Sequence, residues 1–241
     1  MSREGLKIVD FHSHVLPGID DGASDIEESV KLLGELSAQG IDRVVLTSHF
    51  YGSGESSERF LDRRDNALSI LEAYITENDL QLPELIAASE VRLYNDMHKD
   101  ENLSRLCIGT SRYILVEMPY AKWTPWMYNE VYALTATGYI PVMAHVERYI
   151  DFVSKKDIED KLLSLDVLVQ CNADSFLGFR SRRYLKRLIK QDRVSVIGSD
   201  CHNLTARPPK LAEAMQYICK KYGEEYLDYL MYNADEILLK A

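Results

Sequence analysis

The first strand-like pattern of the chain is the run Ile8-Val9-Asp10-Phe11-His12-Ser13-His14. Its apolar residues predict a short buried strand that ends in two histidines. Successive side chains of a strand point to opposite faces, so His12 and His14 share a face and can reach one cation together. We favour metal ligation, because neutral imidazole is a common ligand of first-row metals. For this motif alone, a strand cap and a surface histidine are the alternative.

Length and composition restrict the class of protein. The 241 residues carry a net charge of -10, which argues against nucleic acid as a partner, because phosphate contacts need clustered Lys and Arg. No stretch has the apolar length of a membrane span, and residues 1–6 lack the apolar core of a signal peptide. The four cysteines form no Cys-x-x-Cys pair, so we expect free thiols in a cytoplasmic protein without membrane insertion.

Apolar runs rich in β-branched residues alternate with helical patterns along the chain. The expected strands are 7–11, 43–47, 84–89, 113–116, 140–144, 167–171 and 194–197. Helices are expected from a capping-box match at Ser24 and Glu27, over 57–77, and from Pro125. This alternation predicts a parallel sheet, and we expect one domain over residues 1–241, a distorted seven-stranded (β/α) TIM-like barrel. A doubly wound open sheet is the alternative.

Strong metal ligands follow six of the seven expected strands. In parallel α/β folds the carboxyl ends of the strands meet where active sites lie. The side chains at these ends are His12, His14, Asp21, His49, Glu90, Glu117, His145, Asp200 and His202. Of the six histidines, only His98 lies elsewhere in the pattern.

This set of ligands is larger than one ion takes, so we predict a multinuclear centre. Carboxylates and imidazoles gathered in one pocket would repel or neutralise one another unless cations lie between them. Nitrogen and oxygen ligands without thiolate suit Mn, Fe or Zn, and disfavour Ca and structural cysteine-type zinc. For any single residue, a helix cap or an ion pair at the start of a loop is the alternative.

Four longer segments carry a family resemblance. They are Asp10-Phe11-His12-Ser13-His14, Leu16-Pro17-Gly18-Ile19-Asp20-Asp21-Gly22-Ala23, His145-Val146-Glu147-Arg148-Tyr149 and Ser199-Asp200-Cys201-His202-Asn203. In order and spacing over nearly the whole chain, the sequence resembles the PHP superfamily and, within it, the CpsB/YwqE-type tyrosine phosphatases of bacterial capsule and exopolysaccharide operons. It departs from that pattern before His49, where the family often has proline, and at Cys201, where methionine is usual.

The resemblance implies a PHP fold with three divalent ions, usually manganese, although Fe, Zn or Mg would also fit. The first ion would be held by His12, His14, Glu90 and Asp200. Glu90 would bridge to a second ion that is completed by Glu117 and His145, and the third would be held by Asp21, His49 and His202. Arg148 and Arg207 match phosphate-contact positions of the family, and the arginine fork suits phosphate.

The implied reaction is hydrolysis of phosphotyrosine on a protein. We expect a metal-bridging hydroxide to attack phosphorus directly. Phenolate is a fair leaving group, since the pKa of tyrosine is about 10. The resemblance implies that the partner is a bacterial tyrosine autokinase that controls polysaccharide export. The alternatives are a PHP-type small-molecule phosphoesterase such as histidinol phosphatase, and a non-enzymatic scaffold of the export machinery.

Residues 201–207 offer a different phosphatase chemistry. Cys201 and Arg207 fit the Cys-x5-Arg loop of cysteine-based tyrosine phosphatases, in which a thiolate attacks phosphorus. The segment has no glycine, Pro208 follows the arginine, and the clustered histidines would have no role. We therefore favour the metal centre.

The acidic chain contains one cluster of basic residues. It consists of Arg180, Arg182, Arg183, Lys186, Arg187 and Lys190. We interpret it as a solvated helix face. The alternative hypothesis is that it steers an anionic phosphopeptide toward the active site.

Overall fold

A computed structural model describes residues 6–239. Residues 1–5 and 240–241 lie outside the described residues. They include most of residues 1–6, which were considered above as a possible signal peptide, and both ends of the expected domain 1–241. In the described part the strand segments form two sheets in which all pairs are parallel. One sheet has the order β1 (Val9–Ser13), β2 (Arg43–Leu46), β4 (Glu84–Ala87). The other has the order β3 (His49–Phe50), β5 (Glu90–Arg92), β6 (Tyr113–Glu117), β7 (Ile140–Met143), β8 (Leu168–Asn172), β9 (Val196–Gly198).

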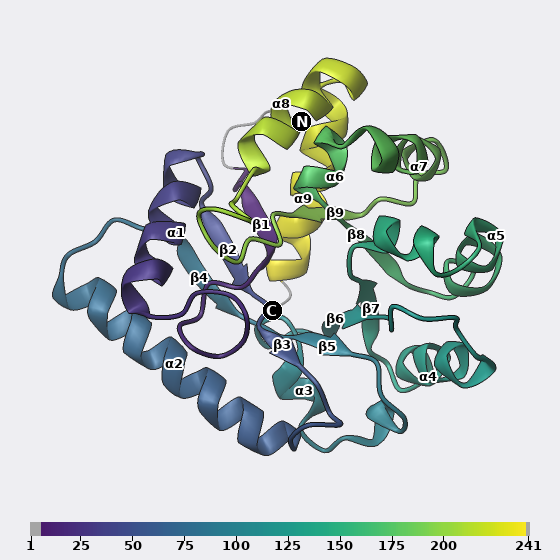
Figure 1. Ribbon diagram of the computed structural model, residues 1–241, viewed down its shortest axis with the longest axis horizontal. Helices are drawn as coiled ribbons and strands as arrows, with labels where there is room; N and C mark the ends of the chain where they lie inside the picture. Colours follow the sequence, from purple (N-terminus) through teal and green to yellow (C-terminus); the bar gives the residue numbers. More distant parts are fainter. Residues whose placement is uncertain (1–5, 240–241) are drawn as a thin grey trace.

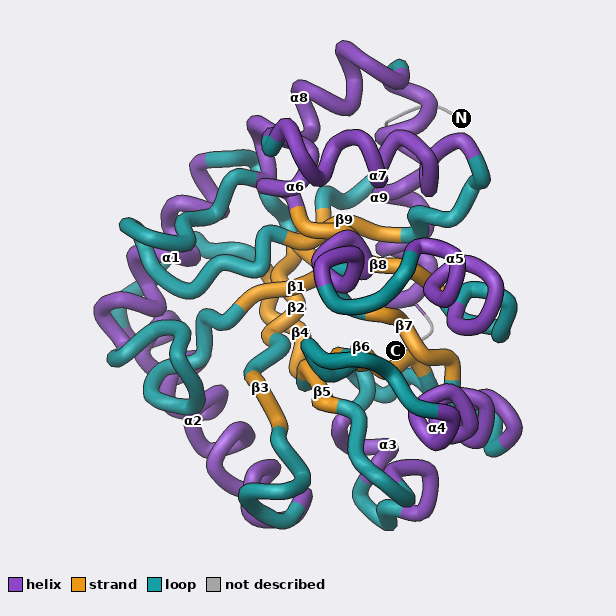
Figure 2. The backbone as a smooth tube through the Cα atoms, turned by 45° about the vertical axis from the view of Figure 1, so that its right-hand side comes forward, coloured by secondary structure: helices purple, strands orange, loops and turns teal. Residues whose placement is uncertain are grey.

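The two sheets are parts of one barrel with seven strand positions. Residues 47–48 separate β2 from β3, and residues 88–89 separate β4 from β5, so each pair is one interrupted strand. The interrupted strands remain neighbours, because β2 pairs with β4 and β3 pairs with β5. A parallel bridge between Ser13 and Cys201 joins the ends of β1 and β9 and closes the ring (Figure 2). The expected distorted seven-stranded barrel is confirmed, and the doubly wound open sheet is wrong.

Helices surround the strands (Figure 1). Their bounds are α1 Ile26–Ala38, α2 Ser57–Glu77, α3 Leu103–Leu106, α4 Pro125–Ala136, α5 Lys155–Asp157, α6 Ala173–Leu177, α7 Phe179–Lys190, α8 Leu211–Tyr222 and α9 Glu224–Leu239. Short turns of other helix types cover η1 Met97–Lys99, η2 Val146–Asp151 and η3 Ile158–Leu162. Between residues 6 and 239, no helix has both the length and the apolar character that crossing a bilayer requires.

Local signals fix several helix ends. The predicted helix over 57–77 and the predicted start at Pro125 are confirmed. The first helix starts differently from the prediction, since Asp25 is the N-cap and accepts a hydrogen bond from the backbone N–H of Glu28. The Glu28 carboxylate accepts in turn from the backbone N–H of Ser24. The capping pair is shifted by one residue because Asp caps a helix as well as Ser does.

Apolar packing fills the barrel and closes one of its ends. The interior contains side chains from the strands, such as Phe11, Leu115 and Val142, together with Ala234 and Ile237 of α9. Polar contacts fix α9 at the amino ends of the strands. Arg43, the first residue of β2, bonds to Asp235 at 2.6 Å, and the carbonyl of Ser195, just before β9, accepts from Asn233. The carboxyl ends of the strands remain for a functional site, as in other barrels.

Glycine at position 198 brings β1 and β9 together where the ring closes. A Cβ atom at Gly198 would collide with the backbone and Cβ of His12. Only glycine therefore permits this approach. The backbone N–H of Asp200 donates to the carbonyl of His12 at 2.7 Å. The first and last strands thus bring their ligands side by side.

Candidate metal centre

Glu90, the first residue of β5, is the centre of the polar cluster at the carboxyl ends of the strands. Its Oε2 lies 3.3 Å from Nε2 of His12, 3.4 Å from Nε2 of His14 and 2.9 Å from Nδ1 of His49. Its Oε1 lies 2.7 Å from Nε2 of His145. The Glu90 side chain is fully buried. One carboxylate therefore faces imidazoles from four positions in the chain.

The other acids join the same cluster. Oδ1 of Asp200 lies 3.6 Å from Nε2 of His12 and 3.4 Å from Nε2 of His14. Oε1 of Glu117, at the end of β6, lies 3.7 Å from Nε2 of His145. These contacts bring together the residues that the family resemblance assigns to the first two ions.

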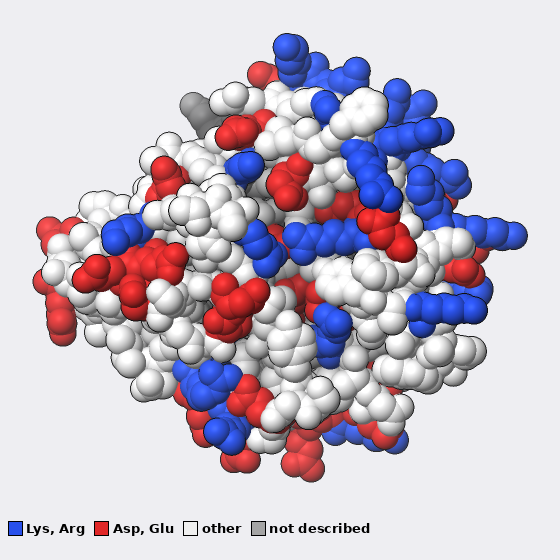
Figure 3. Space-filling view, viewed as in Figure 1, with Lys and Arg blue, Asp and Glu red and all other residues white. Residues whose placement is uncertain are grey.

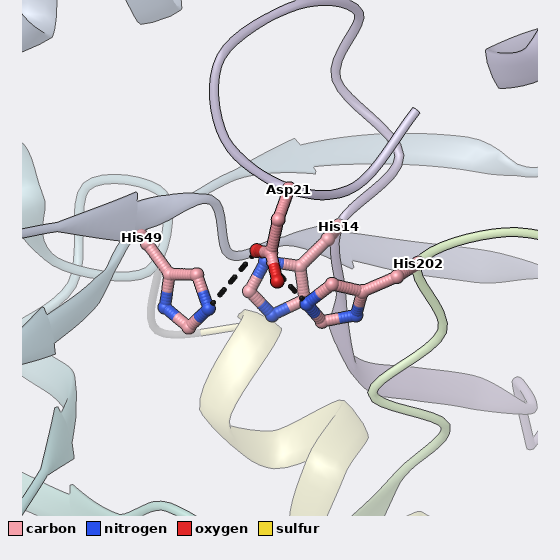
Figure 4. Close-up of side chains that lie close together, drawn as sticks. All are labelled: His14, Asp21, His49 and His202. Carbon is pink, nitrogen blue, oxygen red and sulfur yellow. Dashed lines mark ion pairs between the residues drawn. The ribbon is translucent and has the colours of Figure 1, made fainter. Parts of the chain in front are cut away.

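A third group lies toward the surface (Figure 4). Oδ1 of Asp21 lies 3.5 Å from Nε2 of His49 and 3.3 Å from Nε2 of His202. The Asp21 side chain is 66% exposed, so this group is open to solvent. The rings of His14 and His202 are 3.9 Å apart between centroids, which makes His14 part of this group as well.

The groups form one continuous cluster. In the described residues, ligand atoms within 4.8 Å of one another occur in three overlapping sets: His14, Asp21, His49 and His202; His12, His14 and Asp200; His49, Glu90 and Glu117. These sets contain eight of the nine candidate ligands. The ninth, His145, joins them through its 2.7 Å contact with Glu90. His98 lies apart and pairs with Glu130 at 2.7 Å.

The cluster contains buried nitrogen and oxygen atoms that have no hydrogen-bond partner in the described part of the protein. His49 Nδ1, Glu90 Oε2 and His202 Nε2 make no hydrogen bond among the described residues. Leaving such atoms buried without partners costs about 1–3 kcal/mol each. A divalent cation among the nitrogen and carboxylate atoms would satisfy them, so the residues present fit a metal centre.

The imidazoles are oriented so that their Nε2 atoms face inward. In four histidines Nδ1 has an oxygen partner that can accept a hydrogen bond from Nδ1–H, and this tautomer leaves the Nε2 lone pair free. The four pairs are His12 with Gln170 at 3.1 Å, His14 with Asp20 at 2.8 Å, His145 with Tyr120 at 3.4 Å, and His202 with the carbonyl of Asp200 at 3.0 Å. This is the tautomer that metal ligation through Nε2 requires.

Two of these orienting residues were not identified from the sequence. The carboxylate of Asp20 accepts hydrogen bonds from the ring of His14 and from the backbone N–H of His49. Gln170 on β8 accepts from the His12 ring and from the backbone N–H of His145. Gln170 alternates with apolar Val169 and Cys171, and this inward polar position was the available signal.

The pKa shifts of several of these residues are consistent with metal binding. Burial alone would raise the pKa of Glu90, but the charge of His12 and the close imidazoles of His12, His14 and His145 hold it well below its usual value. Burial likewise opposes ionisation of Asp200, and His12, His14 and Arg148 outweigh it and lower its pKa. Burial, with the charge of His14, lowers the pKa of His202 to about 3. Glu90, Asp200 and His202 are thus in the forms that bind metal. The pKa values of His12 and His14 are raised against the effect of burial by neighbouring carboxylates, so a bound cation would replace a proton there.

Two of the candidate ligands have strained backbones. His145 has φ 31° and Asp200 has φ 53°, a region that residues other than glycine rarely adopt. Such conformations cost about 1–3 kcal/mol each and cluster at functional sites, although Asp79, Asp96 and Asp192 adopt them elsewhere in this chain. Hydrogen bonds hold both backbones, from His145 N–H to Gln170 and from Asp200 N–H to His12, each at 2.7 Å.

Both predicted arginines lie at this cluster. Arg148 contacts one oxygen of Asp200 at 2.9 Å, and Arg207 contacts the other at 2.8 Å. Their side chains are 35% and 34% exposed. Two guanidinium groups therefore reach the ligands while keeping an edge toward solvent.

A third arginine was missed. Arg92 donates to Oε2 of Glu117 at 2.6 Å and lies between the rings of Tyr51 and Tyr120. Tyr51 stacks on the ring of His49, and Tyr120 stacks on the ring of His145. Arg92 is two positions after Glu90 on one strand, and that shared face was the available signal.

The thiol of Cys201 is poorly suited to nucleophilic attack. Its side chain is fully buried, and burial raises its pKa to about 12. Arg207 faces the carboxylate of Asp200. The Cys-x5-Arg alternative needs an accessible thiolate, and the geometry does not support it.

Comparisons with known proteins agree with this site. The family model for capsular polysaccharide synthesis, CpsB/CapC, matches residues 8–240. The tyrosine-protein phosphatase CpsB of Streptococcus pneumoniae is 31% identical over 235 residues, which cover 90% of this chain and 91% of that protein. The tyrosine-protein phosphatase YwqE of Bacillus subtilis (strain 168) is 27% identical over 237 residues, which cover 97% and 92%.

Solved structures give the same result. A structure from work on YwqE of Bacillus subtilis and CpsB of Streptococcus pneumoniae, described as unique metal-dependent tyrosine phosphatases, has a TM-score of 0.81 and 26% identity, and covers 97% of this chain and 95% of that one. The phosphotriesterase of Mycobacterium tuberculosis has a TM-score of 0.60 and 12% identity, with 100% and 96% covered. At that identity the likeness shows the fold alone.

Proposed function

The chain belongs to the CpsB/CapC family of capsular polysaccharide synthesis, and from this premise we propose that it is a metal-dependent tyrosine-protein phosphatase. The observation that carries the proposal is the cluster of imidazoles and carboxylates around Glu90, with its unsatisfied buried donor atoms. The relatives that match over nearly the whole chain are tyrosine-protein phosphatases. We further propose that residues 1–241 act as one phosphatase domain.

We propose that the cluster holds three divalent ions, with Mn the best candidate and Fe, Zn or Mg as substitutes. The proposed ligands are His12, His14, Asp21, His49, Glu90, Glu117, His145, Asp200 and His202. When bound, the ions activate a water molecule and neutralise charge on the phosphoryl group. The overlap of the three ligand sets at His14 and His49 supports neighbouring ions rather than isolated ones.

The surrounding residues bind and orient the substrate. Arg148 and Arg207 are the proposed donors to the phosphoryl oxygens, because both guanidinium groups are already directed at the ligand Asp200 from the solvent side. Arg92 holds Glu117 in position. The rings of Tyr51 and Tyr120 flank the cluster. Tyr51 is 43% exposed, and we propose that it contacts the phenyl ring of the substrate.

Substrate comparison tests the proposed function. The metal-loaded protein is assayed on a phosphotyrosine peptide, a phosphoserine peptide, histidinol phosphate and p-nitrophenyl phosphate. The aromatic wall and the better phenolate leaving group predict a kcat/KM for phosphotyrosine peptide at least about 100-fold above that for phosphoserine peptide. A higher kcat/KM for histidinol phosphate than for phosphotyrosine peptide would overturn the assignment.

Replacing Arg207 by alanine is expected to lower kcat/KM on a phosphotyrosine peptide by about 100-fold, because one donor to the phosphoryl oxygens is lost. Arg207→Lys keeps the charge but loses the fork, and is expected to recover only part of that loss. Arg193→Ala removes an exposed arginine just before β9 and serves as the matched control. Wild-type kcat/KM in Arg207→Ala would remove this residue from the proposed site.

Cys201→Ser is expected to keep kcat/KM within about threefold of wild type, because the buried thiol is not a nucleophile here. Cys201→Ala is a second variant, since a hydroxyl at this buried position can destabilise the fold. Steady-state kinetics and metal content are measured on both. If both variants lost activity while keeping their metal and their fold, the result would support the alternative in which the Cys201 thiolate attacks phosphorus.

We propose that the phosphoprotein substrate is a bacterial tyrosine autokinase and that the encounter takes place in the cytoplasm. The link of the family to capsular polysaccharide synthesis supports the first part, and four free cysteines support the second. Deleting the gene in its host should raise the phosphotyrosine content of that kinase. Unchanged kinase phosphorylation would refute the partner without affecting the proposed chemistry.

A further inference from the structure

A basic groove lies between α7 and α8, outside the metal centre. Its cavity volume is about 780 Å³, and its lining consists of Phe179, Arg180, Arg182, Arg183, Lys186, Tyr217, Lys221 and Tyr222. The lining contains five cationic and three aromatic side chains and no acidic one. In the space-filling view, Lys and Arg side chains gather at the edge of the molecule that α7 occupies (Figure 3).

Most of the positive charge in the basic groove is not balanced by nearby acids. Within residues 6–239, Arg183, Lys186 and Lys221 make no ion pair with Asp or Glu, whereas the neighbouring Arg187 pairs with Glu159. Arg182 lies over the ring of Tyr217 at 5.5 Å. Like charges placed side by side repel one another. An anion bound in the groove would relieve this repulsion.

Phe179, the first residue of α7, is a second unusual feature of the basic groove. Its side chain is 89% exposed, the highest value among the large exposed apolar residues. The apolar residues of α7 itself, such as Tyr184, Leu185 and Leu188, are buried in the core. The helix therefore cannot turn an apolar face toward a bilayer, while Phe179 remains free to contact an aromatic ligand.

The basic groove is joined to the metal centre through η2. Arg180 in the groove pairs with Asp151 at 2.8 Å. Asp151 is the last residue of η2, which also carries Arg148 and follows the ligand His145 directly. A peptide that continued from the groove past Arg180 toward Asp151 would reach η2, which carries one of the proposed phosphate-binding arginines.

We propose that the basic groove binds a second phosphotyrosine of the same protein substrate while the first occupies the metal centre. Guanidinium and ammonium groups bind phosphate, and aromatic faces stack on the phenyl ring. The concave shape and the aromatic lining favour a peptide over a flat membrane surface. The inference rests on the proposed function, because it needs a phosphotyrosine protein as substrate.

Binding of non-hydrolysable phosphonate peptides to the metal-loaded protein tests this proposal. Peptides with one and with two phosphotyrosine mimics, at several spacings, are compared by fluorescence anisotropy. At the best spacing, wild type should bind the doubly modified peptide about tenfold more tightly than the singly modified one. The double variant Arg183→Gln/Lys186→Gln should reduce that ratio to about one.

The matched control is Lys31→Gln/Lys99→Gln, which removes the same charge at exposed lysines of α1 and η1. It should keep the wild-type ratio, and both double variants should keep wild-type kcat/KM on p-nitrophenyl phosphate. An unchanged ratio in the Arg183→Gln/Lys186→Gln protein overturns the proposal. So does a loss of binding to phosphatidylserine vesicles in that variant with the peptide ratio intact, which would assign the patch to membranes. Failure of wild type to hydrolyse any phosphotyrosine substrate would refute the proposed function instead.

Discussion

Glu90→Gln is expected to lower kcat/KM on a phosphotyrosine peptide by about 1,000-fold or more and to reduce the bound metal. Glutamine keeps the shape of the side chain but replaces one carboxylate oxygen by an amide NH₂. In this structure both oxygens face imidazole nitrogens, from His12, His14 and His49 on one side and from His145 on the other. Whichever way the amide is turned, its NH₂ group, which cannot ligate a metal, would replace an oxygen that we propose to be a ligand. Kinetics and metal analysis of the purified variant measure both effects.

Glu130→Gln is the matched control for this substitution. Glu130 is also buried, and it accepts hydrogen bonds from His98 and from the backbone N–H of Asp96, away from the cluster. Its amide variant should lose stability of about 1–3 kcal/mol but keep the metal and kcat/KM per folded molecule. If Glu90→Gln retained its full metal content and activity, Glu90 could not be the shared ligand of the centre.

The positions of the candidate ligands were predictable because a strand end is a local feature. His12, Glu90 and Asp200 each follow an apolar run, and the general rule for parallel barrels says where such ends meet. No knowledge of the exact neighbours was needed. The start of α4 at Pro125 was equally local, since proline at the first turn fits a helix without losing a hydrogen bond.

Features that depend on pairs of distant residues were not predictable. Gln170 is useful only because β8 lies beside β7 and turns this side chain inward to His12 and His145. The closing of the barrel depends on Gly198 against His12. The end of α9 fills the barrel through contacts such as Asn233 with Ser195. Sequence periodicity predicts which face of an element is buried, but it does not predict which other element packs against that face.

The role of Arg92 could not be predicted from the sequence either. Its spacing from Glu90 gives the shared face, but a single arginine after a ligand is also a common surface residue. The structure adds that it donates to Glu117 and lies between two tyrosine rings. Together these contacts connect the second proposed ion to the wall where the phenyl ring would stack. That connection requires β5 and β6 to be neighbours, which only their pairing shows.

Removal of metal by a chelator is expected to abolish turnover and to lower the melting temperature. An ion that binds the folded state alone stabilises it by about 4 kcal/mol when its free concentration is about 1,000 times Kd. For a chain of this size that corresponds to about 10 °C in Tm. The physical reason is that His49 Nδ1, Glu90 Oε2 and His202 Nε2 are buried without a hydrogen bond among the described residues, and cations would satisfy them.

Differential scanning calorimetry and phosphotyrosine turnover measure the two effects on the same preparation. Adding Mn²⁺ back after dialysis should restore both, and the Glu90→Gln protein should show little change in Tm on either step. This comparison separates metal bound at the cluster from metal bound at scattered surface carboxylates, because only the first depends on Glu90. A preparation that is free of transition metal and yet fully active would contradict the metal centre. The imidazoles and carboxylates of the cluster would then have to act without cations to neutralise the charge of the carboxylates.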